Sequence, residues 1–190
     1  MSVRDSKRER SDRKGKAGFV ELLRDQIRNE FNAHQQYLAL AVWFDAQDLP
    51  RLAAHFYRQS LEERNHAMMI VQYLLDQDVT VDIPGCDPPR NDLHNARDLV
   101  ALALEQENEV TDQIVALAKV ARDEGDYIGE QFLQWFLKEQ VEEVSSMSTL
   151  LNVIDRAGDT LFHVEDFLAR ETIGDGTTAP GAPAAAGGTV

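Results

Sequence analysis

Apolar residues recur every three to four positions through four long stretches of this chain, which is the spacing of the buried face of an α-helix. These stretches cover residues 19–45, 49–77, 96–124 and 127–156. Pro50 suits the first turn of the second helix, where an amide hydrogen is not needed, with Asp48 as a candidate cap. The sequence therefore predicts an all-α fold built on four long helices.

The connections between these stretches differ in length. Two connections are short and consist of a helix-ending glycine followed by a helix-starting aspartate: Gly125-Asp126 and Gly158-Asp159. The second of these pairs precedes a short fifth helix that we expect over about 160–170. Residues 78–95 form the one long connection. Eighteen extended residues reach up to roughly 60 Å, whereas a 28-residue helix is roughly 42 Å long. We therefore expect two helical hairpins joined by one long crossover.

The composition excludes several classes of protein. The 190 residues suit a single domain with tails, and 43% of them are hydrophobic, which is enough for a core. Cys86 is the only cysteine, so an intrachain disulfide and a cysteine-based zinc site are ruled out. Because the chain has no run of eighteen apolar residues and no apolar segment after its basic start, we expect neither a membrane span nor a signal peptide. A cytoplasmic protein is the default expectation.

Charge is distributed unevenly along the chain. The net charge is −14, but residues 1–18 hold seven basic and three acidic side chains, a net +4 that leaves −18 for the rest. This acidity argues against nucleic-acid binding by the body of the protein. Residues 174–190 are almost entirely Gly, Ala, Pro and Thr. We expect a disordered basic arm at 1–18, a folded domain at 19–173 and a flexible tail at 174–190.

Each apolar stripe is interrupted near its middle by ionisable or amide side chains. These residues are, in helix order, Glu30, then Glu63 and His66, then Glu107, then Gln140 and Glu143. Mid-helix positions of packed helices meet at one level, so the four glutamates should share a buried layer. Burying one bare carboxylate costs several kcal/mol, and no Lys or Arg lies on these stripes. Protons or metal ions must therefore neutralise the layer.

Two divalent cations would balance the four glutamates. Glu63 and His66 are spaced i, i+3, so one helix can offer both to a single metal, as di-iron bundles do. The fourth helix departs from that pattern, because Gln140-x-x-Glu143 stands where a second Glu-x-x-His would be. Carboxylate and imidazole donors without a thiolate favour Fe or Mn. A non-enzymatic bundle with protonated, hydrogen-bonded carboxylates and a di-iron oxygenase or peroxidase stay open as alternatives.

Three segments carry a resemblance to a known family. They are 29–37 (NEFNAHQQY), 62–67 (EERNHA) and 132–143 (FLQWFLKEQVEE). By these segments the chain resembles the ferritins over about residues 19–173, and in particular the haem-free ferritins of actinobacteria. The resemblance implies a ferritin-like four-helix bundle with one long crossover. It also implies a short fifth helix, packed around the fourfold axes of a hollow cage of twenty-four subunits.

The resemblance assigns roles to the residues of the predicted layer. It implies that Glu30, Glu63 and His66 bind the first iron of a ferroxidase centre. Glu63 would bridge to a second iron, which Glu107 and Glu143 would also bind. Two Fe(II) ions would be oxidised there by O2 or H2O2, and the product would be stored in the cage as ferric oxyhydroxide.

Other residues take part in the same resemblance. Tyr37 would donate a hydrogen bond or an electron at the site, and Gln140 would lie beside it. Glu62, Glu139 and Glu142 match a third, weaker iron site of bacterial ferritins, although an exposed helix face explains these three nearly as well.

The same resemblance argues against haem. The haem-binding branch of the family has a methionine directly after the glutamate of the second helix, and this chain has Arg64 there.

The two ends of the chain have compositions that are compatible with more than one binding partner. Mini-ferritins of the starved-cell type bind DNA through lysine-rich arms, so residues 1–18 keep a DNA-protecting iron and peroxide detoxification protein as the alternative function. Those relatives build their iron site between subunits, whereas the ligands here lie within one bundle. The tail at 174–190 is either a docking peptide for a larger protein shell or a linker without a partner.

Overall fold

The structure is a computed structural model that describes residues 18–92, 94–171, 173–174 and 181–190. Its helices are α2 (Phe19–Asp45), α3 (Pro50–Asp76), α4 (Ala96–Glu124), α5 (Tyr127–Ala157) and α6 (Phe162–Arg170). Within these ranges the chain forms no strand. The all-α prediction is confirmed, with helix boundaries that differ from the expected ones by at most two residues. None of the described helices is both long and apolar enough to cross a membrane.

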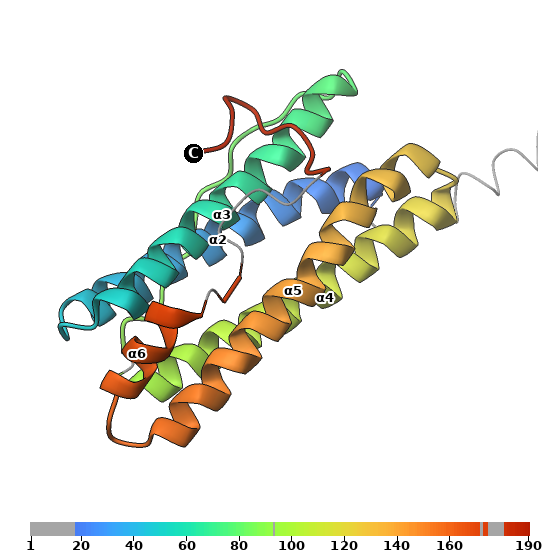
Figure 1. Cartoon of the computed structure of the whole chain (residues 1–190). Helices are drawn as coiled ribbons and strands as arrows, with labels where there is room; N and C mark the ends of the chain where they lie inside the picture. The colour runs from blue at the N-terminus through green and yellow to red at the C-terminus, as the bar shows by residue number, and fades with distance from the viewer. Residues whose placement is uncertain (1–17, 93, 172, 175–180) are drawn as a thin grey trace, which may run out of the picture.

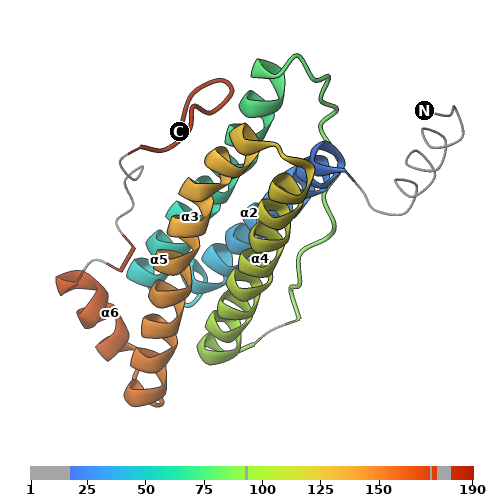
Figure 2. The same cartoon turned by 90° about the vertical axis from the view of Figure 1, so that its right-hand side faces the viewer.

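The long helices form two antiparallel hairpins, α2 with α3 and α4 with α5, which lie side by side as a four-helix bundle (Figure 1). The crossover from α3 to α4 runs along the outside of the bundle (Figure 2). Asp87 of this crossover accepts hydrogen bonds from Arg28 (2.5 Å) and Asn32 (3.0 Å) of α2. The backbone N–H of Arg90 donates to the side chain of Gln36, also on α2 (2.7 Å). The crossover is therefore fastened to the first helix at several points.

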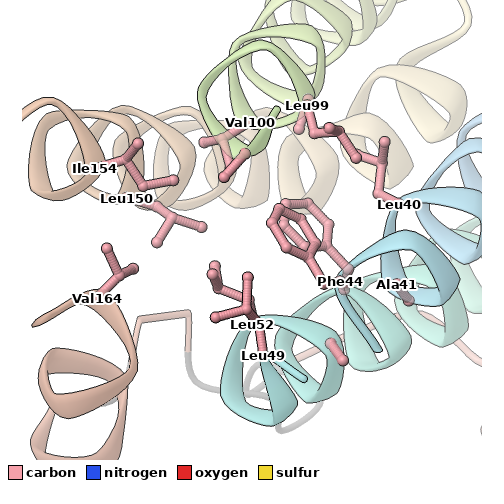
Figure 3. Close-up of a cluster of buried hydrophobic side chains, with 14 of the residues drawn as sticks. Leu40, Ala41, Phe44, Leu49, Leu52, Leu99, Val100, Leu150, Ile154 and Val164 are labelled. Atoms are coloured by element: carbon pink, nitrogen blue, oxygen red, sulfur yellow. The ribbon is translucent and has the colours of Figure 1, made fainter. Parts of the chain in front are cut away.

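Two apolar clusters fill the bundle, one on each side of its middle. The cluster near α6 includes Phe44, Leu52, Val100 and Leu150 (Figure 3). The other cluster includes Leu23, Ile70, Ile114 and Leu133. On each long helix, the glutamate of the predicted layer lies in sequence between the residues of one cluster and those of the other. The fold thus holds a polar layer between two apolar ones, which keep solvent out along the bundle axis.

The turn between α4 and α5 follows the predicted capping. Gly125 ends α4 in the left-handed conformation (φ 75°), which glycine adopts without steric cost. Asp126 then begins α5 by accepting a hydrogen bond from the backbone N–H of Gly129 (2.8 Å). The Gly-Asp pair is thus a helix stop followed by a helix start.

The start of α3 differs from the prediction. Asp48 does not cap this helix, because the capping position is Leu49, which has no side-chain acceptor. Glu165 of α6 supplies the cap instead, accepting hydrogen bonds from the backbone N–H groups of Arg51 (2.8 Å) and Leu52 (2.9 Å). A carboxylate at a helix N-terminus satisfies free N–H groups and interacts favourably with the helix dipole. The short fifth helix is therefore attached to the bundle by a polar contact as well as by apolar packing.

Replacing Glu165 by alanine is expected to loosen α6 from α3 and to cost about 1 kcal/mol, the usual effect of losing a helix cap. Hydrogen–deuterium exchange should become faster in the peptide that contains Arg51 and Leu52, and the melting temperature should fall. Asp166→Ala is the matched control, because Asp166 is the next residue on α6 and is exposed. Equal exchange in the two variants would contradict a capping role.

Residues 181–190 lie against α3 (Figure 1). The backbone N–H of Ala186 donates to the carbonyl of Met68 (3.0 Å). The side-chain amide of Asn65 exchanges two hydrogen bonds with the backbone of Val190, both 3.3 Å long. The described residues 181–190 of the tail thus contact α3 through Ala186 and Val190, and the flexibility of the tail stays a prediction.

The expected boundaries of the chain ends can be followed only in part. The basic arm predicted at 1–18 lies outside the described residues except for Gly18, and so do residues 175–180 of the tail. The helix α2 begins at Phe19, the first residue of the predicted domain.

Candidate metal centre

The middle of the bundle is a layer of carboxylates, amides and one imidazole. The predicted layer residues are all at most 7% exposed: Glu30 on α2, Glu63 and His66 on α3, Glu107 on α4, and Gln140 and Glu143 on α5. Each residue reaches the layer because it lies on the apolar stripe of its helix, between the two core clusters. The structure therefore brings the predicted residues together at one level.

Three of these residues form a compact group. Glu30, Glu63 and His66 each offer a ligand atom, and these atoms lie within 4.8 Å of one another. The Nδ1 atom of His66 is 3.3 Å from a carboxylate oxygen of Glu63, and its ring packs edge-on against Trp135. Gln26 donates a hydrogen bond to Glu30 Oε1 (3.0 Å), while Glu30 Oε2 is buried without a hydrogen-bond partner among the described residues. A metal ion bound to Glu30 Oε2 would give this buried oxygen a partner.

Glu107 is held from two sides. The hydroxyl of Tyr37 donates to one carboxylate oxygen, and Gln140 Nε2 donates to the other at 3.0 Å. Tyr37 is fully buried, and burial, followed by the charge of Glu107, raises the pKa of its hydroxyl well above 10. The hydroxyl therefore remains a proton donor at neutral pH. Tyr37 and Gln140 thus both lie where the sequence places them, beside the carboxylate layer.

Glu143 contacts a residue that the sequence did not single out. Gln59 of α3, which is 4% exposed, donates from Nε2 to Glu143 Oε1 at 3.4 Å and to Glu62 Oε2 at 2.8 Å. The Oε2 atom of Glu143 has no hydrogen-bond partner in the described part of the chain. The sequence feature that could have identified Gln59 as part of the site is its position on the buried stripe, one turn before Glu63.

A second group of possible ligands lies beside the first. Glu62, His66 and Glu139 also bring one ligand atom each within 4.8 Å of one another. Glu142, which the sequence associates with Glu62 and Glu139, does not belong to this group. Its side chain is 50% exposed and faces Lys138 at 3.8 Å.

The buried layer has no cationic side chain to balance it, since the described part of the protein buries no Lys or Arg. Burial raises the pKa of Glu63 and of Glu143 well above the usual 4.5, and the neighbouring carboxylates raise both further. Burial also raises the pKa of Glu107, while the hydrogen bonds from Tyr37 and Gln140 lower it. Without a metal, protons must therefore neutralise part of the layer, and divalent cations can replace these protons.

Comparison of the chain with models of protein families finds the Ferritin-like domain over residues 20–157. The chain belongs to the ferritin family. The match includes every carboxylate of the buried layer, together with Tyr37, His66 and Gln140.

Similar proteins agree with this assignment. The chain is 65% identical over 170 residues to ferritin BfrB of Mycolicibacterium smegmatis, covering 90% of this chain and 93% of that relative. It is 59% identical over 173 residues to ferritin BfrB of Mycobacterium tuberculosis, covering 91% and 95%. It is 35% identical over 141 residues to the bacterial non-heme ferritin of Staphylococcus aureus, covering 74% and 85%. The resemblance to actinobacterial ferritins is confirmed.

Solved structures confirm the fold. An open-pore ferritin from the archaeon Archaeoglobus fulgidus superposes with a TM-score of 0.77 and 27% sequence identity, covering 81% of this chain and 97% of that one. The ferritin-like four-helix bundle with a short fifth helix is therefore confirmed.

Proposed function

We propose that this ferritin stores iron and that Fe(II) is its substrate, oxidised at a di-iron ferroxidase centre within each subunit. The observation that carries the proposal is the buried layer, in which four glutamates and one histidine converge without a buried cation to pair with them. Carboxylate and imidazole donors suit iron. The matches to named ferritins over most of the chain support the same function.

In this proposal Glu30, Glu63 and His66 bind the first Fe(II). Glu63 bridges to the second Fe(II), which Glu107 and Glu143 also bind. Each Fe(II) loses one electron. Either O2 takes both electrons and two protons to give H2O2, or H2O2 takes them to give two molecules of water. The carboxylates hold the ions together and leave coordination positions open for the oxidant.

Tyr37 and Gln140 act on the second ion through Glu107. Their hydrogen bonds occupy one oxygen each of this carboxylate and set its orientation. Tyr37 also lies close enough to the layer to supply an electron, as the family resemblance implies.

We further propose that the ferric product is stored as ferric oxyhydroxide inside a homo-oligomeric cage of twenty-four subunits. Large apolar side chains that are well exposed on the single chain support an assembly: they include Phe162 on α6 (75%), Tyr127 (76%) and Val141 (70%). The acidic body would draw Fe(II) towards the protein.

Several expectations accompany this proposal as predictions. Arg64 in place of a methionine predicts a ferritin without haem. The ligands come from one chain, which favours a ferritin over a mini-ferritin-like protein that protects DNA. That alternative depends on the basic arm at 1–18, which lies almost wholly outside the described residues. A cytoplasmic location and docking of the tail to a larger shell also remain predictions.

Size-exclusion chromatography and aerobic Fe(II) oxidation test the proposal together. The expected particle has a mass of about 510 kDa, twenty-four times 21.4 kDa. It should oxidise Fe(II) faster than buffer does and retain far more than two ions per subunit. A particle of one or two subunits, or oxidation at the rate of buffer, would contradict the proposal. A DNA mobility shift by the full chain would favour the mini-ferritin alternative.

A further inference from the structure

Glu30 belongs to the compact group with Glu63 and His66, and one of its two carboxylate oxygens is already held. Gln26 lies one helical turn before it on α2 and donates from Nε2 to Glu30 Oε1 at 3.0 Å. Residues four positions apart lie on one face of a helix, so these two side chains meet. Glu30 Oε2 is buried and has no hydrogen-bond partner among the described residues. One oxygen is therefore occupied, and the other is open to a cation.

Gln26 is itself fixed in orientation by a second amide. It is 2% exposed, and Asn29 Nδ2 donates to its Oε1 at 3.3 Å. If the amide of Gln26 turned over, its oxygen would face the carboxylate of Glu30, and its NH2 group would face the NH2 group of Asn29. Both of those contacts are repulsive. Only the orientation that donates to Glu30 therefore satisfies both neighbours.

Asn29 extends these hydrogen bonds to another helix. Its Nδ2 atom also donates to Gln113 Oε1 of α4 at 3.0 Å, and the two hydrogens of one NH2 group can serve both acceptors. Gln26, Asn29 and Gln113 thus form an amide chain that runs from the buried Glu30 to half-buried positions where α2 and α4 pack together. The orientation of a proposed metal ligand on α2 therefore depends on a side chain of α4.

Glu107 shows what the amide chain leaves free at Glu30. Both oxygens of Glu107 are occupied, one by the hydroxyl of Tyr37 and the other by Gln140. A cation at Glu107 must share an oxygen with one of these donors or displace it. A cation at Glu30 can use Oε2 and leave the hydrogen bond from Gln26 intact. The amide chain therefore prepares one position of the layer before a cation binds.

We propose that Gln26 is a positioning residue for the first iron and that Asn29 and Gln113 act through it. Partners of a metal ligand fix its orientation and commonly raise metal affinity. Without the amide chain, the carboxylate of Glu30 would be free to rotate, and the incoming cation would have to order it. The inference rests on the proposed function only in taking the compact group as the ligands of the first Fe(II).

Zn(II) tests this inference on the assembled protein, because it is not oxidised and its affinity can be measured by competition with a coloured chelator. Gln26→Met removes both the donor and the acceptor while nearly keeping the length of the side chain. We expect the first Zn(II) per subunit to bind about 10- to 100-fold more weakly, the usual effect of removing a partner of a metal ligand. Unchanged affinity for the first Zn(II) would overturn the proposal.

The second Zn(II) per subunit separates positioning from packing. Glu107 and Glu143 bind this ion in the proposed centre, so Gln26→Met should weaken it much less than the first. A general loosening of the bundle would weaken both steps equally, and that result would overturn the positioning role. The matched control Gln72→Met should leave both steps unchanged, since Gln72 lies on α3 and donates to Asp76 (2.7 Å).

Asn29→Asp tests the amide chain without touching Glu30 or Gln26. The new carboxylate has nearly the shape of asparagine but only accepts hydrogen bonds, so it cannot donate to Gln26 Oε1. Its negative charge alone would strengthen the binding of a cation, whereas a broken amide chain would weaken it. We expect weaker binding of the first Zn(II). An affinity equal to or above that of the wild type would overturn the role of Asn29.

Asn108→Asp is the control for charge, because Asn108 is exposed on α4 and donates to the carbonyl of Leu104 (2.8 Å). It should leave the affinity for the first Zn(II) unchanged. Particle size is checked by chromatography for every variant, and if Gln26→Met does not assemble, Asn29→Asp decides the proposal.

Zn(II) binding and Fe(II) oxidation fail independently. Weaker Zn(II) binding by Gln26→Met, in a protein whose wild type does not oxidise Fe(II), would overturn only the proposed function. Normal oxidation by the wild type, with unchanged Zn(II) binding by Gln26→Met, would overturn only the positioning role of Gln26.

Discussion

Glu63→Ala is expected to lower the initial rate of Fe(II) oxidation by about 100-fold or more. Glu63 lies in one compact group with Glu30 and His66, and the charge of Glu107 contributes to its raised pKa. Glu63 therefore interacts with residues proposed for the first iron and with Glu107, which is proposed for the second. Loss of a residue one shell further from a metal commonly costs 10–100-fold, so removal of a bridging ligand should cost at least as much.

The rate is best measured as ferric absorbance after rapid aerobic mixing, with particle size checked by chromatography so that lost assembly is not mistaken for lost chemistry. Glu109→Ala is the matched control, since it removes an exposed carboxylate from α4. Glu63→Gln should behave like Glu63→Ala in oxidation while keeping the side-chain volume. Wild-type rates in both Glu63 variants would show that the ferroxidase assignment is wrong.

Much of the fold and the buried layer follows from helical periodicity. Glu30, Glu63, Glu107 and Glu143 lie on apolar stripes near mid-helix, and helices of similar length that pack side by side bring such positions to one level. The tight Gly125 turn and the long crossover then leave little choice of topology.

The contacts that periodicity cannot predict are those set by connections and by side-chain rotamers. Glu165 caps α3 at Arg51, 114 positions away, because of the path that the chain takes after α5. Glu142 lies at the edge of the apolar stripe of its helix. Helix spacing predicts on which face of the helix this residue lies, but it does not predict which side chain its carboxylate contacts. It faces Lys138, and His66 instead completes the group of possible ligands with Glu62 and Glu139.

Metal-free protein with glutamine at position 63 is expected to be more stable than metal-free wild type, and the difference should grow as the pH rises above 4.5. The pKa of Glu63 is raised well above 4.5 in the folded protein, first by burial and then by Glu107 and Glu30. Above pH 4.5 the unfolded chain releases this proton while the folded protein keeps it. The folded state then binds more protons, so its stability falls with rising pH until the raised pKa is passed.

His55 acts in the opposite direction and must be separated from this effect. Burial, with a smaller contribution from Arg58, lowers the pKa of His55 from 6.5 to about 4. The unfolded chain therefore takes up a proton below pH 6.5 that the folded protein does not bind. The contribution of His55 to stability is present above pH 6.5 and is lost as the pH falls towards 4. Because His55 is the same in wild type and Glu63→Gln, the difference between the two melting temperatures removes its contribution.

This difference in stability is measured by the melting temperatures of metal-free wild type and metal-free Glu63→Gln between pH 4.5 and 8.5. In a chain of this size, each kcal/mol of unfolding free energy shifts the melting temperature by about 2–4 °C. Zn(II) should stabilise the wild type more strongly as the pH rises, because it displaces protons from the layer, and it should stabilise Glu63→Gln much less. Calorimetric titrations in two buffers of different ionisation enthalpy should show proton release on Zn(II) binding. A pH-independent difference in melting temperature, with no proton release, would mean that the buried glutamates are already ionised in the metal-free protein.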